Sequence, residues 1–147
     1  MNTSEATELI HRFMDEVWNR GDFSRLKSLV ANPYTVFSDP GDPWNGKTLD
    51  HETFRVRVNY TRLAFPDVCF DIKEAISNDG KVAIRWLMTG THLGDLPVLP
   101  ATGRSFAIEG MTFYYLEQGK ICGHRQAFDQ LGFLAQIGML RLGANQA

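Results

Sequence analysis

The chain is poor in cysteine and has no long apolar run. Its two cysteines, Cys69 and Cys122, are too few for a disulfide-rich scaffold, and each lies in a predicted strand, where a small buried thiol is common. No apolar stretch approaches the length of a membrane span, and Met1 opens no charged-then-apolar leader. We therefore expect a cytoplasmic protein with no membrane partner.

An excess of charge of one sign is also missing. Lysine and arginine number 15 against 17 aspartates and glutamates, so the net charge is −2 at pH 7 and nothing favours nucleic acid as a partner. The four histidines, at positions 11, 51, 92 and 124, do not have the spacing of metal ligands, and no metal is expected. With 147 residues, of which 44% are hydrophobic, residues 1–147 are expected to form one domain.

Helical periodicity is concentrated in the first half of the chain. Three helices are predicted there, at Thr3–Arg20, Asp22–Val30 and Asp50–Leu63. Strand-like segments follow, after a short one at Tyr34–Phe37: Val68–Ser77, Lys81–His92, Arg104–Glu117 and Lys120–Asp129. This order predicts an α+β domain in which a curved antiparallel sheet forms a cone, with the three N-terminal helices on one face and a short C-terminal helix.

The last two strands form a predicted hairpin around Gln118-Gly119. A tight turn would pair Leu116 with Ile121 and, further along, Ile108 with Asp129. One face would then carry Ile108, Thr112, Tyr114, Arg125 and Asp129, and the other would carry Met111, Phe113, Tyr115, Cys122, His124, Gln126 and Phe128. A slip of one residue would exchange the two faces of a strand.

Asp129 is the first candidate for chemistry, because this register places its carboxylate among apolar neighbours at the start of the final helix. An acid in apolar surroundings is a frequent site of proton transfer. The alternative is structural, since aspartate directly before a helix is a preferred N-cap.

Several segments, in order along the chain, resemble the SnoaL-like polyketide cyclases. They are Phe65-Pro66-Asp67, Val82-Ala83-Ile84-Arg85-Trp86, Gly90-Thr91-His92, Thr102-Gly103-Arg104, Gly119-Lys120-Ile121, His124 and the run from Asp129 to Gly138. The resemblance implies the NTF2-like cone, an enzyme that closes a ring by intramolecular aldol condensation without a cofactor, and a small apolar or polyketide-like substrate. It also implies that Asp129 is the catalytic acid/base.

Asp39 is the second candidate. The segment Val36-Phe37-Ser38-Asp39-Pro40 resembles the place where ketosteroid isomerases, another NTF2-like family, carry their general base. The first helix has Phe13 and Met14 and lacks the tyrosine of those enzymes. The alternative is an aspartate that forms a turn before Pro40-Gly41.

Residues that could bind substrate are predicted from the same hairpin and from the strand before it. Arg125 stands where the family usually has tryptophan, and it could orient a carbonyl or anionic group near Thr112 and Tyr114, or be solvated on the outer surface. The remaining candidates are Ile108 in the pocket wall, His92 near its mouth and Trp86 as a ligand platform or core residue. His124 is expected on the outer face.

Two other functions remain open from the sequence. One is a ketosteroid-isomerase-like isomerase or hydratase, and the other is a non-catalytic module that binds a small ligand and dimerises. The predicted outer face, with Met111, Phe113, Tyr115, Cys122 and Phe128, is too apolar for water, so a homodimer or larger homo-oligomer is expected.

Overall fold

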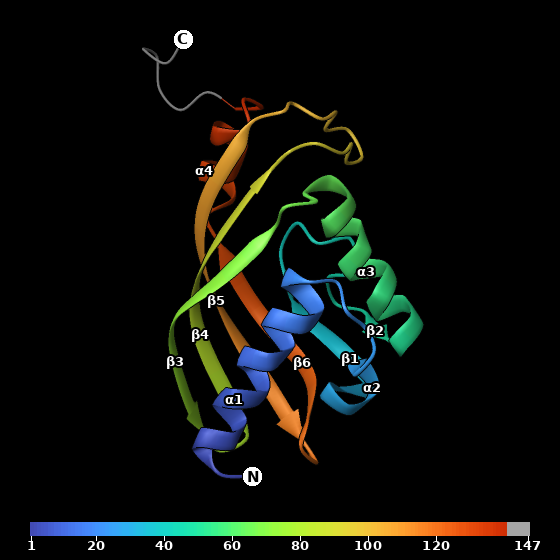
Figure 1. Cartoon of the computed structure of the whole chain (residues 1–147), viewed down its shortest axis with the longest axis vertical. Helices are drawn as coiled ribbons and strands as arrows, with labels where there is room; N and C mark the ends of the chain where they lie inside the picture. Colours follow the sequence, from blue (N-terminus) through green and yellow to red (C-terminus); the bar gives the residue numbers. More distant parts are fainter. Residues whose placement is uncertain (141–147) are drawn as a thin grey trace.

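A computed structural model describes residues 1–140, so residues 141–147 of the predicted domain lie outside the described part. A curved six-stranded sheet, in the order β2-β1-β6-β5-β4-β3, carries helices on one face (Figure 1). The predicted α+β class is confirmed. The elements are α1 Thr3–Phe13, η1 Met14–Asn19, α2 Leu26–Leu29, β1 Val30–Ser38, β2 Thr48–Leu49, α3 His51–Ala64, β3 Cys69–Asn78, β4 Lys81–Thr91, β5 Ser105–Glu117, β6 Lys120–Phe128 and α4 Gln130–Gln136.

The first helix changes its winding halfway. A capping box between Asn2 and Glu5 starts α1, and after Phe13 the chain continues as the π-helix η1 to Asn19. Gly21, at φ 63°, ends the segment in the left-handed conformation that glycine adopts without strain. The predicted helix Thr3–Arg20 is therefore present, but its second half is a π-helix, a form that is frequent at functional sites.

The second predicted helix is much shorter than expected. Only Leu26–Leu29 is helical, and β1 begins at Val30 and continues through Pro33 to Ser38. The strand pairs with β6 in parallel and with β2 antiparallel, so the sheet is mixed and not wholly antiparallel as predicted. Pairing with distant parts of the chain decided the structure of Val30–Pro33, where local propensity favoured a helix end.

The third helix has its predicted bounds to within one residue, but Val56 and Leu63, expected on its buried side, are exposed. The Asp50 side chain accepts a hydrogen bond from the Thr53 amide and so caps α3, as expected for aspartate at this position. Phe54, Arg57 and Val58 form its buried side, and Arg57 is the charged residue in this apolar stripe. None of the helices in residues 1–140 is both long and apolar enough to cross a membrane.

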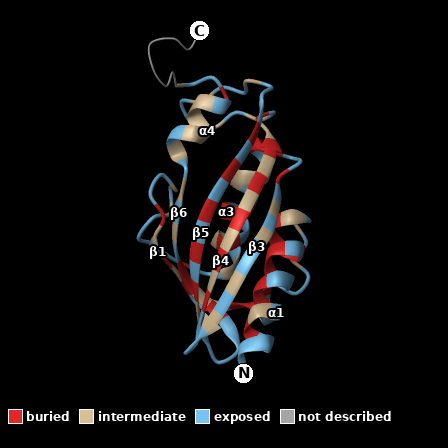
Figure 2. Ribbon diagram, turned by 90° about the vertical axis from the view of Figure 1, so that its left-hand side faces the viewer, coloured by how far each residue is buried: buried red, intermediate tan, exposed pale blue. Residues whose placement is uncertain are grey.

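The four strands after α3 form an antiparallel meander. Asp79 and Gly80 adopt φ values of 49° and 70° in the tight turn between β3 and β4, and Asn78 pairs with Lys81, as the Asn-Asp-Gly sequence predicts. Figure 2 shows that buried residues alternate with exposed ones along β5 and with partly buried ones along β4. One side chain in two therefore faces the helices.

The last hairpin contains a β-bulge that changes the predicted faces of β6. Leu116 lies opposite Ile121 as expected, but Tyr115 then lies opposite Gly123, so Cys122 is an extra residue in β6. Beyond it the inward side chains of β6 are His124, Gln126 and Phe128, and the outward ones are Arg125, Ala127 and Asp129. The predicted faces of β5 are correct, whereas those of β6 beyond the bulge are wrong.

Candidate functional site

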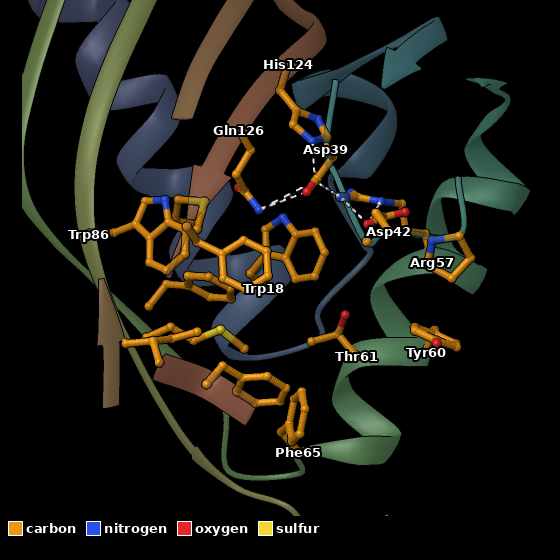
Figure 3. Close-up of a pocket in the computed structure, with 18 of the residues that line it drawn as sticks. Trp18, Asp39, Asp42, Arg57, Tyr60, Thr61, Phe65, Trp86, His124 and Gln126 are labelled. Carbon is orange, nitrogen blue, oxygen red and sulfur yellow. Dashed lines mark hydrogen bonds and ion pairs between the residues drawn. The ribbon is translucent and has the colours of Figure 1, made fainter. Parts of the chain in front are cut away.

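A cavity of about 170 Å³ lies between the concave face of the sheet and the helices η1 and α3. Its walls are mainly apolar and aromatic, and a cluster of polar side chains lies at one end, where β1, β6 and α3 meet (Figure 3). The residues that line it are Met14, Trp18, Tyr34, Asp39, Gly41, Asp42, Pro43, Arg57, Tyr60, Thr61, Phe65, Phe70, Trp86, Met88, Leu96, Ile108, Tyr114, His124, Gln126, Phe128 and Phe133. An apolar cavity with a few convergent polar groups is typical of a small-molecule site.

Asp39 is the carboxylate at the centre of the polar end. It follows directly after β1, and its side chain is only 2% exposed. Its Oδ2 accepts hydrogen bonds from His124 Nε2 at 2.8 Å and from Arg57 Nη2 at 3.1 Å. Among residues 1–140, its Oδ1 has only one contact, a long one of 3.4 Å to Gln126 Nε2. The donors compensate the buried charge at Oδ2 and leave Oδ1 as the less occupied oxygen.

The backbone around Asp39 fixes this placement. The Asp39 amide donates to Asn45 Oδ1 at 2.7 Å, and the Asp42 amide donates to the Asp39 carbonyl at 3.0 Å. The turn-forming role expected of Asp39 is therefore carried by its backbone, while its side chain points into the cavity. The two interpretations of Asp39 in the sequence are compatible.

Arg57 links Asp39 to a second carboxylate. Its guanidinium lies 3.0 Å from Asp42 Oδ2 through both Nε and Nη2, and its side chain is 6% exposed. The guanidinium carbon also lies 5.3 Å from the centre of the Trp18 ring, a cation–π distance. Asp42 Oδ1 accepts from the Trp44 amide, so both of its oxygens are occupied, in contrast to those of Asp39.

His124 connects Asp39 to Tyr34. Its Nδ1 lies 2.5 Å from the Tyr34 hydroxyl, and Nε2 lies 2.8 Å from Asp39. Burial lowers the pKa of His124 from its ordinary value, although the hydrogen bond to Asp39 acts in the opposite direction. A neutral imidazole in this position donates a hydrogen bond from Nε2 to the carboxylate. Its Nδ1 then accepts a hydrogen bond from the Tyr34 hydroxyl.

The apolar wall depends on a glycine in β5. A Cβ atom on Gly110 would lie 2.3 Å from Trp86 Cζ2, so the indole occupies the space where a side chain would be.

Tyr114 is also part of the wall, and within residues 1–140 its hydroxyl donates only to the weak acceptor Met14 Sδ, at 3.4 Å. Burial raises the pKa of Tyr114, so its hydroxyl stays protonated and can donate to a ligand.

Two of the predicted site residues are exposed on the outer surface of the molecule. Asp129 was expected to face the cavity, but the bulge turns its side chain to the opposite face, where it is exposed and accepts from the Gly132 amide at 2.8 Å as the N-cap of α4. Arg125 is also exposed, with its guanidinium 5.2 Å from the centre of the Phe37 ring. The expected placement of Asp129 is wrong, and of the two placements considered for Arg125 the structure has the one on the outer surface. Both positions result from the one extra residue in β6.

The other predicted residues have different outcomes. Trp86, Tyr114 and Ile108 line the cavity as expected. Thr112 is buried behind the wall, between Trp86 and Gln126. His92 is fully buried but does not line the cavity, because its ring packs against Phe65 and its Nδ1 lies 3.2 Å from Thr102 Oγ1.

Arg57, His124 and Gln126 belong to the site but were not predicted from the sequence. His124 and Gln126 were assigned to the outer face by the uninterrupted register. For Arg57 the sequence did contain a signal. Arg57 lies on the same face of α3 as Phe54 and Val58, and the structure buries this face. A charged residue in that position is seldom fully buried unless it is paired.

Within residues 1–140, no group of three or more His, Cys, Asp or Glu side chains is arranged to hold a metal ion.

Comparison with known proteins identifies relatives over nearly the whole chain. The family model for SnoaL-like polyketide cyclases matches residues 8–137. Two aklanonic acid methyl ester cyclases each align over 92% of this chain: DauD of Streptomyces sp. (strain C5) is 28% identical with 83% of its length covered, and DnrD of Streptomyces peucetius is 29% identical with 92% covered. A candidate polyketide cyclase from Acidithiobacillus ferrooxidans has a solved structure that superposes with a TM-score of 0.84 and 40% identity, covering 90% of this chain and 94% of that one.

Proposed function

Because this chain belongs to the SnoaL-like polyketide cyclases, we propose that it closes a ring in a polyketide-like ester by intramolecular aldol condensation, with Asp39 as the acid/base. One observation carries the assignment of Asp39. It is a buried carboxylate in the cavity wall whose Oδ1 has a single long contact, whereas both oxygens of Asp42 are engaged. Asp129, the residue that the family resemblance favoured, is an exposed helix cap.

The reaction begins with proton removal from a methylene group activated by neighbouring carbonyls. The C–H bond breaks, its proton moves to Asp39 Oδ1, and the electron pair forms the enolate. The enolate carbon attacks a ketone of the same molecule, and a new C–C bond closes the ring. The protonated Asp39 then returns its proton to the resulting alkoxide, so the carboxylate is regenerated and no external reagent is consumed.

Arg57 and His124 hold the Asp39 carboxylate in position for both proton transfers. Both donate to Oδ2, so they fix the carboxylate plane and leave Oδ1 toward the ligand. His124 is kept neutral by burial and so orients the base without adding a second proton source of its own.

The apolar wall is suited to a flexible and reactive chain. Aromatic rings from several elements surround the cavity, with Trp18 from η1, Trp86 from β4 and Tyr114 from β5. Such walls hold the enolate carbon and the ketone close together. They also exclude water, which would otherwise take part in side reactions. Orientation of this kind is a large part of what a ring-closing enzyme must supply.

The substrate class is proposed from the similarity to the two aklanonic acid methyl ester cyclases of Streptomyces. Aklanonic acid methyl ester is therefore the first compound to test. Ring closure would be followed by chromatography and mass spectrometry, with wild type compared to Asp39→Asn and Asp129→Asn. Loss of the base should reduce the rate about 10²–10⁴-fold in Asp39→Asn. Asp129→Asn is the matched control, since asparagine caps helices about as well as aspartate.

The outcomes separate the alternatives. Full activity in Asp39→Asn, with loss in Asp129→Asn, would contradict the assignment of the base. A product with a shifted double bond and no new ring would indicate an isomerase. Tight binding of the ester with no product in any variant would indicate a binding module.

We also propose that the protein forms a homodimer through the outer face of its sheet. Exposed apolar side chains gather there, and they include Phe37 at 43%, Met111 at 62% and Phe113 at 51% exposure. Phe37 and Tyr115 pack edge to face on this surface, with ring centroids 5.5 Å apart. Phe128, which the sequence placed on this face, lines the cavity instead.

A further inference from the structure

A chain of three hydrogen bonds runs through the wall to the catalytic end of the cavity. The Trp86 indole donates from Nε1 to Thr112 Oγ1 at 2.9 Å, and the Thr112 hydroxyl donates to Gln126 Oε1 at 2.8 Å. The Gln126 amide nitrogen then lies 3.4 Å from both oxygens of Asp39 (Figure 3). This series of hydrogen bonds connects β4, β5 and β6 with Asp39, the residue that follows β1.

The direction of these bonds follows from chemistry alone. An indole N–H can only donate, so Thr112 Oγ1 must accept from it and send its single hydrogen to Gln126. Gln126 must therefore present its carbonyl oxygen to Thr112 and its NH₂ group to the carboxylate, which can only accept. The donor at one end of this series of hydrogen bonds and the acceptor at the other therefore require the same orientation of the Gln126 amide.

These hydrogen bonds are well shielded from water. Trp86 is 2% exposed and Thr112 is 1% exposed, and each of their polar side-chain groups has a partner. Gln126 is half-buried and lines the cavity, whereas Thr112 lies behind the wall. Thr112 therefore contacts no ligand and acts only through Gln126.

We propose that Gln126 is a catalytic hydrogen-bond donor that stabilises the enolate oxygen, with Thr112 as its positioning residue. The proposal rests on the function proposed for Asp39. When the carboxylate removes a proton next to a carbonyl group, the carbonyl π electrons move onto the oxygen and negative charge develops there. The Gln126 NH₂ has two hydrogens and only long contacts to Asp39, so it can donate to an oxygen bound beside the base. A donor already oriented toward the point where charge develops lowers the barrier without reorganisation.

The first test compares Gln126→Met with Asp39→Asn in the ring-closure assay. Methionine is similar in length but cannot donate, so we expect kcat to fall about 10²–10³-fold with a much smaller change in KM, as for the loss of one oxyanion donor. A wild-type kcat in Gln126→Met together with an inactive Asp39→Asn would overturn the role of Gln126 and leave the proposed function intact. A wild-type kcat in Asp39→Asn would overturn both.

The second test addresses the positioning role of Thr112. Thr112→Val keeps the shape but removes the hydroxyl, whereas Thr112→Ser keeps the hydroxyl. We expect kcat to fall in Thr112→Val and to be restored in Thr112→Ser. In ¹⁵N NMR spectra the side-chain NH₂ protons of Gln126 should exchange with water faster in Thr112→Val than in wild type or Thr112→Ser. Equal kcat and equal exchange in all three proteins would overturn the positioning role, and thermal unfolding of each variant would establish that it is folded.

Discussion

Tyr114 lies opposite His124 in the β5–β6 pair, whereas Leu116, two residues nearer to the turn, lies opposite Ile121. The difference is the single extra residue, Cys122, on the β6 side of the hairpin. It brings His124 and Gln126 to the cavity and sends Asp129 to the outer surface. Gln126, and the His124 that holds Asp39 in position, therefore reach the cavity because of a bulge that lies outside it.

Replacing Arg57 with methionine should destabilise the fold strongly. The substitution would leave Asp39 and Asp42 close together without the cation that lies 3.1 and 3.0 Å from them. Loss of one partner from a buried ion pair costs about 3–5 kcal/mol of the free energy of unfolding, measurable by urea denaturation. Arg55→Met is the matched control on the same helix, since Arg55 is about half exposed and its pair with Glu52 is worth about 0–1 kcal/mol. Equal stability of the two variants would contradict a structural role of the buried network.

Stability should fall as the pH is lowered through 6.5, partly because of His124. Burial holds the pKa of His124 below this ordinary value. The unfolded chain therefore binds a proton there that the folded chain does not, and the free energy of unfolding decreases as pH decreases, until the folded pKa is also passed. Melting temperatures measured across this window should depend less on pH in His124→Asn than in wild type. His11→Asn, at an exposed position of α1, should keep the wild-type dependence, and an unchanged slope in His124→Asn would count against the prediction.

Removing the Asp129 side chain should affect stability and not the proton-transfer step. Asp129→Ala removes the acceptor for the Gly132 amide at the start of α4 and should cost about 0.5–2 kcal/mol in urea denaturation. Asp129→Asn should recover most of that loss. A large drop in kcat in the asparagine variant, at unchanged stability, would return Asp129 to the list of proton-transfer groups.

A methyl group at position 110 should disturb the cavity wall. In Gly110→Ala the added carbon would lie 2.3 Å from Trp86 Cζ2 and 2.9 Å from Phe128 Cβ, so one of these side chains must move. Overpacking of this kind costs about 1–3 kcal/mol, and a shift in tryptophan fluorescence should accompany it. Combining the change with Trp86→Phe should relieve part of the cost, since the smaller ring leaves room. Additive losses in the double variant would show that the indole is not the group displaced.

A lysine at position 113 should dissociate the proposed homodimer. Wild-type protein is expected to scatter light as twice the 16.6 kDa chain, and Phe113→Lys as a single chain, because the charge would lie in the apolar contact. Leu63→Lys is the control, since Leu63 is 74% exposed on α3, away from the sheet face. A monomeric wild type at micromolar concentration would exclude this assembly.

Features that depend on local sequence were predicted well. The Asn78-Asp79-Gly80 turn and the bounds of α3 each rest on residues close together in the chain. The inward positions of Trp86, Ile108 and Tyr114 also follow from simple alternation along β4 and β5. For these elements, short-range propensity and burial favour the same answer.

The errors arose where the structure depends on long-range pairing. No local pattern identifies Cys122 as an unpaired residue, and a single such residue reverses every side chain beyond it. The contacts of Asp39 with Arg57 and with His124 join segments 18 and 85 residues apart, so spacing along the chain could not reveal them. Asp39 was identified as a candidate, but its partners required the fold.

The bridge that Arg57 makes between Asp39 and Asp42 also has an electrostatic consequence. One cation faces two anions, and neutral His124 adds no charge, so this end of the cavity retains an excess of negative charge in surroundings that water screens poorly. This negative charge would repel a ligand with an ionised carboxyl group. It would not repel the same ligand if that group were esterified. Under the proposed function, this charge would favour an esterified substrate over the same molecule with a free carboxylate.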